Sequence, residues 1–124
     1  MGEPLTLKAA ARALARGETT SRALVEASLD RMLDPAGEGA RAFVGVFADE
    51  ARAAADAFDR LRAAGAAPSP YAGIPISIKD LFDVAGEVTT AGSLLLQNSA
   101  PAQRDSVAVA RLRRAGAASP GHCH

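Results

Sequence analysis

Apolar residues recur every three to four positions in four segments of the chain, which is the spacing of a helix that buries one face. The first segment runs from Leu5 to Arg16 and stops at Gly17. The second follows a Thr/Ser cluster that offers N-caps and closes at Asp34-Pro35. The third is "ADEARAAADAFDRLRAAG", and the fourth is "SVAVARLRRAGA", for which Asp105 is the expected N-cap. The pattern therefore predicts four helices.

Two short apolar runs break this period and predict strands. Phe43–Phe47 is a β-prone run after glycines, and in Ile74–Ile78 the isoleucines alternate with Pro75 and Ser77. Because proline has no N–H donor, Pro75 suits the start of a strand or an edge strand. Residues 79–105 form a long connection, and a structureless stretch of that length is uncommon unless it is functional. Helices that feed strands favour an α/β layer structure.

Composition limits the size of the core and the kinds of partner. The 124 residues suffice for one small domain. Hydrophobic residues make up 48% of the chain, but alanine dominates this share and aromatic residues reach only 4%, so we expect a thin core. Fourteen basic residues balance fourteen acidic residues, so no basic face indicates a nucleic-acid partner.

The expected compartment is the cytoplasm. The single cysteine, Cys123, permits no disulfide within the chain, which is typical of a reducing compartment. The N-terminal residues lack the continuous apolar stretch of a signal peptide. No window of 18 residues is apolar and uncharged, so we expect no membrane span.

Lys79 directly follows the second predicted strand, in a chain that otherwise prefers arginine. Lys8 and Lys79 are the two lysines among 14 basic residues, and the other 12 are arginines. Burial disfavours the charged form of a lysine, and a neutral amine accepts protons, which arginine cannot do. The alternative is a solvated lysine at a strand end that pairs with Asp80. Spacing alone favours the solvated lysine.

One block of the sequence carries a family resemblance. "GIPISIKDLFDVAGEVTTAGS", followed after a short gap by "DSVAVARLRRAGA", resembles the N-terminal part of the amidase signature family. Looser similarity extends the resemblance from about Leu5 to Ala117. It implies an α/β fold: N-terminal helices plus the first strands of a mixed sheet flanked by helices, which is incomplete here.

The resemblance also implies a chemistry. Members of this family hydrolyse or transfer amide groups with a Ser–cis-Ser–Lys triad, so Lys79 is the implied catalytic base, with no cofactor and no metal. The implied substrate is a small-molecule amide. The family's two serines lie downstream in a Gly/Ser-rich stretch that these 124 residues do not contain. Ser77, Ser93 and Ser99 lack that sequence context, and none of them is assigned as the nucleophile.

Four further polar residues and the last three residues allow functional and structural interpretations. Asp80 either orients the local backbone or pairs with a neighbouring cation, or it serves as a turn or cap carboxylate. For Thr89, Thr90 and Ser93 we favour hydrogen bonding within the loop. The "HCH" at residues 122–124 cannot easily place three ligands on one metal ion, so we favour a frayed tail.

The pattern of the family is lost after Ala117. We therefore assign residues 1–117 to the N-terminal part of an amidase domain and residues 118–124 to a tail outside the family. The family continues here with an apolar strand, which we expect to be missing from this chain. The hypothesis is a truncated or frameshifted gene, or a fragment, with no amidase activity as an isolated chain.

Two other functions remain open. The chain could be a subunit or fragment of an amidotransferase, although "AGS" and "DLFDVAG" look more like stand-alone amidases. It could also be a non-catalytic α/β module that binds a partner through an exposed sheet edge. The substrate and the oligomeric state cannot be predicted from these residues.

Overall fold

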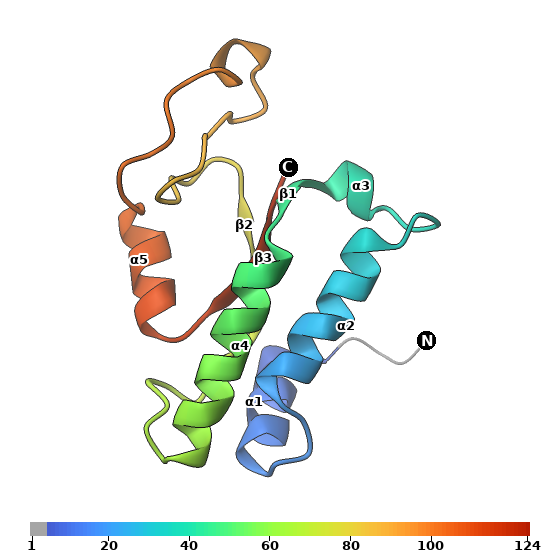
Figure 1. Cartoon of the computed structure of the whole chain (residues 1–124), viewed down its shortest axis with the longest axis vertical. Helices are drawn as coiled ribbons and strands as arrows, with labels where there is room; N and C mark the ends of the chain where they lie inside the picture. Colours follow the sequence, from blue (N-terminus) through green and yellow to red (C-terminus); the bar gives the residue numbers. More distant parts are fainter. Residues whose placement is uncertain (1–4) are drawn as a thin grey trace.

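A three-stranded sheet lies between helices in the computed structural model, which describes residues 5–124 (Figure 1). The helices are α1 (Leu7–Ala15), α2 (Ser21–Leu33), α3 (Gly39–Ala42), α4 (Ala48–Ala63) and α5 (Val107–Arg114). The strands are β1 (Phe43–Val46), β2 (Pro75–Lys79) and β3 (Ala118–Cys123), and η1 (Leu94–Leu96) is a single 3-10 turn. The predicted α/β class is confirmed. No helix among the described residues is long and apolar enough to cross a membrane.

The first two helices begin after threonine caps, of which the sequence pattern predicted the one before α2 and not Thr6 before α1. Thr6 accepts a hydrogen bond from the N–H of Ala9 at 3.1 Å, and Thr20 accepts one from the N–H of Ala23 at 3.0 Å. Each bond satisfies an N–H that has no partner inside its helix. Local sequence therefore fixes where α1 and α2 start.

The expected cap of α5 is wrong by one residue. Ser106, not Asp105, is the N-cap, and its hydroxyl accepts from the N–H of Val109 at 3.4 Å. Asp105 instead accepts a hydrogen bond from the N–H of Ala85 at 2.8 Å and pairs with Arg113 at 3.0 Å. The carboxylate has two partners that are distant in sequence, and a serine can replace it at the cap.

The expected frayed tail at residues 122–124 and the expected missing strand are both wrong. Ala118–Cys123 forms β3, which lies in the middle of the sheet in the order β1-β3-β2. It runs antiparallel to β1 and parallel to β2. No local pattern predicted this strand, because "ASPGHC" neither alternates in polarity nor is rich in β-branched residues. The strand forms because β1 and β2 hydrogen-bond to it on either side, although its own residues have low strand propensity.

Pro120 is tolerated in this central strand because the ladder is irregular there. Pro75 pairs with Ala118 and Ser77 with Gly121, so β3 has one more residue than β2 between the two pairs. Such a bulge leaves a residue out of regular pairing, and a residue without an N–H donor suits that place. Pro75 begins β2, and β2 is an edge strand, as its sequence predicted.

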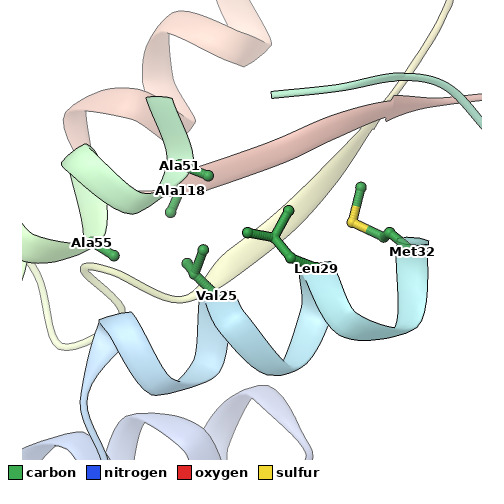
Figure 2. Close-up of a cluster of buried hydrophobic side chains, with 6 residues drawn as sticks. All are labelled: Val25, Leu29, Met32, Ala51, Ala55 and Ala118. Atoms are coloured by element: carbon green, nitrogen blue, oxygen red, sulfur yellow. The ribbon is translucent and has the colours of Figure 1, made fainter. Parts of the chain in front are cut away.

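The main core lies between α2, α4 and the sheet. Figure 2 shows its side chains, which come from α2, α4 and β3. They are Val25, Leu29, Met32, Ala51, Ala55 and Ala118. Three of these six residues are alanines, so the helices approach closely but bury little area per residue. The core is small, as the composition indicated.

The helix α5 packs on the sheet through a single buried residue. Val109 is 1% exposed and contacts Ile78 and Val84. Leu112, which the helical pattern places on the same face, is 44% exposed. The described residues provide nothing that covers the rest of this apolar face.

Candidate active-site lysine

Lys79 is the last residue of β2 and lies beside Cys123 of β3. Its carbonyl oxygen accepts hydrogen bonds from the N–H groups of Leu81 at 2.7 Å and Phe82 at 3.2 Å, so a tight turn follows at once. The N–H of Asp80 donates to the carbonyl of Cys123 at 2.7 Å. These bonds on both sides of the residue hold the backbone of Lys79 in place.

The expected burial of Lys79 is not found. Ser77 and Lys79 are both exposed and lie on one face of the strand, whereas Ile78 on the other face is 5% exposed. An added Cβ on Gly121, which pairs with Ser77, would lie 2.7 Å from Cε of Met32, so α2 covers this face near its own last turn. Lys79 lies two residues further along β2, where no described residue buries it.

Asp80 holds the loop that follows the lysine. Its side chain accepts a hydrogen bond from the N–H of Thr90 at 2.9 Å and a second, very short one from the hydroxyl of Thr90. The residue is only 3% exposed. Among residues 5–124 the structure contains no ion pair between Asp80 and Lys79, so the pairing alternative is wrong and Asp80 is a turn carboxylate.

Opposing effects act on the charge of Asp80. Burial by itself raises the pKa of this carboxyl, because the charged form loses hydration. Hydrogen bonds from the hydroxyl and the N–H of Thr90, the nearby His122 and the N–H of Ala91 together outweigh burial. The net result is a lowered pKa, so Asp80 is ionised at neutral pH and binds Thr90 through charge-assisted hydrogen bonds.

The predicted role of Thr89, Thr90 and Ser93 in hydrogen bonding within the loop is confirmed. Besides the bonds of Thr90, the hydroxyl of Thr89 donates to Asp83 at 2.8 Å. The hydroxyl of Ser93 accepts from the N–H of Leu95 at 3.3 Å and so caps η1. The loop uses these three side chains to keep its shape.

The connection between β2 and α5 is fixed at its base and exposed at its tip. At the base, Gly86 and Ala102 are joined by an N–H to carbonyl bond of 2.9 Å, as are Ala102 and Glu87. Figure 1 shows the connection, coloured yellow to orange, extending away from the helices. At the tip, Leu94 is 79% exposed and Leu95 is 93% exposed.

The described residues include no metal centre and no assigned nucleophile. Among residues 5–124 no group of three His, Cys, Asp or Glu side chains could hold a metal ion. Ser77 shares a strand face with Lys79, and Ser93 is engaged at the start of η1. The candidate site is therefore a single lysine at the end of a strand, with the loop after it held by an Asp–Thr pair.

A protein-family model matches most of the chain. The Amidase family model matches residues 23–124, a range that includes β3. The chain therefore belongs to the amidase family. The match begins within α2 and leaves α1 outside it.

Curated relatives share this segment and are much longer. The A subunit of glutamyl-tRNA(Gln) amidotransferase from Roseiflexus sp. (strain RS-1) is 47% identical over 115 residues, which is 91% of this chain and 23% of that protein. The AtzE subunit of 1-carboxybiuret hydrolase from Pseudomonas sp. (strain ADP) is 41% identical over 105 residues, 84% of this chain and 22% of that protein. The chain thus spans under a quarter of the length of these relatives.

Solved structures contain the same fold. The native peptide amidase from Stenotrophomonas maltophilia superposes with a TM-score of 0.84 at 35% identity, and the match covers 98% of this chain and 25% of that one. A structure of a vestigial protein complex linked to the evolutionary origins of an s-triazine catabolic enzyme superposes with a TM-score of 0.86 at 37% identity. This match covers 96% of the present chain and 26% of the other one. The arrangement of helices and strands described above is that of one part of an amidase.

Proposed function

We propose that Lys79 is the general base of an amidase site of the Ser–cis-Ser–Lys type, and that these 124 residues supply the base-bearing part of it. One observation carries the proposal: Lys79 ends β2 on an open face of the sheet, with its backbone fixed by the turn and by the pairing of Asp80 with Thr90. A positioned amine with an accessible nitrogen is what proton transfer requires.

The proposed chemistry follows the resemblance to the family. The neutral amine of Lys79 accepts a proton from a bridging serine, which takes one from the nucleophilic serine as its oxygen adds to the amide carbon. The leaving amine takes a proton, the carbon–nitrogen bond breaks and an acyl-enzyme remains. Water or a second amine then releases the acyl group. The proposed substrate is a small-molecule amide.

The apolar surroundings that keep such an amine neutral must come from residues outside these 124. Lys79 is exposed here, so residues 5–124 do not desolvate its side chain. None of the serines described is assigned as the nucleophile. A polypeptide of these 124 residues alone is therefore expected not to hydrolyse amides.

Fragment complementation tests the proposal. The purified chain is mixed with the part of a related amidase domain that follows the shared segment, and turnover of a simple amide is measured. We expect turnover only in the mixture. Lys79→Ala and Lys79→Arg should each reduce it by about 10²–10⁴-fold, because arginine keeps the charge but cannot act as a base. Lys8→Ala, at the other lysine, an exposed one on α1, is the matched control and should leave turnover unchanged.

The outcomes separate the alternatives. Full turnover by the mixture with Lys79→Ala would contradict the role of the lysine. Two outcomes would favour the non-catalytic module. One is binding of the second fragment without turnover, and the other is a stable monomer that does not bind the second fragment. The predicted cytoplasmic location stays a prediction that this assay does not address.

A role within an amidotransferase is the second candidate. The observation in its favour is the 47% identity to the A subunit of glutamyl-tRNA(Gln) amidotransferase, against 35% to the peptide amidase. Complementation with the remainder of each of these two proteins distinguishes the candidates. Amidation of glutamyl-tRNA(Gln) in one mixture, without hydrolysis of a simple amide in the other, would favour the amidotransferase.

A further inference from the structure

Arginines gather on the outer face of α5, away from the sheet. Arg111 and Arg114 are exposed residues of this helix. Val107 and Ala110 lie on the same stripe, because the four positions follow the helical spacing i, i+3, i+4 and i+7. Arg104, which is also exposed, precedes the helix. We call these five residues the arginine face.

The three arginines of this face have no acidic partner in the chain. None of them forms an ion pair with any of residues 5–124, and α5 itself contains no Asp or Glu. Elsewhere in the chain, Arg22 and Arg52 both bind Glu26. The helix dipole explains only part of the arrangement, because it favours cations at the C-terminus of a helix and Arg104 lies before the N-terminus.

The arginine face lines a hollow of about 530 Å³ that carries an excess of positive charge. Asp83 and Asp105 also line this hollow, and both carboxylates already have partners in the chain. Asp83 accepts a hydrogen bond from the hydroxyl of Thr89 at 2.8 Å, and Asp105 pairs with Arg113 at 3.0 Å. Three arginines against two engaged carboxylates leave the hollow positive, so charge complementarity favours an anionic partner.

The apolar part of the face favours an acidic peptide over a nucleic acid. Val107 is 68% exposed, and along the stripe it lies between Arg104 and Arg111. A peptide can place an apolar side chain there and carboxylates on either side. Nucleic-acid binding depends on a broad basic surface, whereas this chain balances 14 basic residues with 14 acidic ones.

We propose that the arginine face binds an acidic amphipathic helix of a partner protein. Carboxylates of that helix pair with the three guanidinium groups, each of which offers N–H donors in a geometry that matches a carboxylate. An apolar side chain of the same helix packs on Val107. Because α5 packs against Ile78, it lies on the opposite face of the sheet from Lys79. The surface is therefore separate from the proposed amidase site.

Fluorescence anisotropy of a labelled synthetic peptide, titrated with the full 124-residue chain, tests this proposal. The probe is a helical peptide with several glutamates and one leucine on the same face. The control peptide has glutamine in place of every glutamate. We expect saturable binding of the acidic peptide, which weakens as sodium chloride is added because salt screens exposed charges. We expect no saturable binding of the glutamine peptide.

Two triple variants with the same change of charge locate the binding surface. The first combines Arg104→Gln, Arg111→Gln and Arg114→Gln. It should weaken binding about tenfold, since three exposed ion pairs are lost. The control combines Arg12→Gln, Arg31→Gln and Arg60→Gln. These three arginines are also exposed and without an ion pair among residues 5–124, and the control should bind as the unchanged chain does.

A single change keeps the test decisive if the first triple variant does not fold. Arg104 lies outside any helix, so Arg104→Gln should leave the fold intact and weaken binding about twofold to fivefold. Circular dichroism checks that each variant is folded. Arg60→Gln is the matched single control and should leave binding unchanged.

Four results would overturn the proposal. The first is the absence of saturable binding of the acidic peptide. The second is equal weakening by the two triple variants, which would mean that net charge alone acts. The third is equal binding of the glutamine peptide, which would mean that apolar contact alone acts. The fourth is tighter binding of single-stranded oligothymidylate than of the peptide, which would assign the arginine face to a nucleic acid.

Discussion

At the scale of single residues, neighbouring side chains at the end of β2 have opposite environments. Lys79 is exposed, whereas Asp80 is 3% exposed and has two donors from Thr90. The sequence motif contains both residues but does not state which of them is buried. Two features of the fold decide this: side chains alternate between the two faces of a strand, and α2 covers only part of one face. Asp80 thus stabilises the loop, and the side chain of Lys79 stays exposed.

Thr90→Val tests the importance of the bonds between Asp80 and Thr90. The change removes the hydroxyl donor and keeps the shape of the side chain, so a buried carboxylate loses one of its two partners. We expect a loss of about 1–3 kcal/mol in the free energy of unfolding, measured with denaturant. Thr89→Val is the control, because its bond to Asp83 is exposed, and it should cost less than about 1 kcal/mol. Equal effects of the two changes would contradict this role.

At the scale of elements, charged side chains join α2 to α4. Glu26 of α2 accepts from the guanidinium groups of Arg52 at 2.7 Å and Arg22 at 2.9 Å, and Arg22 also reaches Asp56 of α4 at 2.7 Å. Asp59 of α4 accepts from the N–H groups of Ser21 and Arg22, at 2.7 and 3.0 Å. The two helices that enclose the alanine-rich core are therefore also linked at their polar side.

The ion pairs of Glu26 predict a dependence of stability on pH. Hydrogen bonds from Arg52 and then Arg22 lower the pKa of Glu26 from 4.5 to about 2. A lowered folded-state pKa gives stability that is fully present above about pH 4.5 and is lost as the pH falls toward about 2. Glu26→Gln should flatten the acid limb of the stability curve in this window. Glu18→Gln should leave the curve unchanged, and an unchanged curve for Glu26→Gln would contradict the assignment.

Gly121 allows β3 to occupy the centre of the sheet. A Cβ at this position would lie 2.6 Å from the carbonyl oxygen of Gly45 and 2.7 Å from Cε of Met32. Gly121→Ala should therefore destabilise the chain by about 1–3 kcal/mol, because the backbone of β1 must shift. Gly37→Ala is the control, since the nearest atom to its added Cβ is 3.5 Å away. Thermal unfolding measures both, and a neutral Gly121→Ala would show that β3 is not packed as described.

At the scale of the whole molecule, apolar surface remains uncovered. Leu94 and Leu95 at the tip of the long connection, and Leu112 on α5, are exposed by 79%, 93% and 44%. A sheet of three strands also leaves β1 and β2 as open edges. These features favour self-association of the 124-residue chain in solution.

Replacing the exposed leucines tests this source of association. Leu94→Ser combined with Leu95→Ser should raise the fraction of monomer, measured by size-exclusion chromatography with light scattering, because both side chains contact mostly solvent. The free energy of unfolding should change by less than about 0.5 kcal/mol. Leu29→Ser, a core change in α2, should instead unfold the chain. An unchanged monomer fraction in the double variant would place the association elsewhere.

Features that depend on nearby residues could be predicted before the fold was known. The helical period, the Thr/Ser cluster before α2 and the glycine stops predicted α1, α2, α4 and α5, and the strand patterns predicted β1 and β2. These are local free-energy preferences, readable within a window of a few residues. The motif around Lys79 likewise identified the family, because its residues are contiguous.

Features that depend on distant partners emerged only from the folded chain. β3 exists because β1 and β2 lie on either side of it, although its own residues do not favour a strand. Asp105 leaves the cap of α5 because Ala85 and Arg113 come within its reach. The exposure of Lys79 depends on where α2 ends relative to the sheet. Pairing and burial join residues tens of positions apart, and no local pattern contains that information.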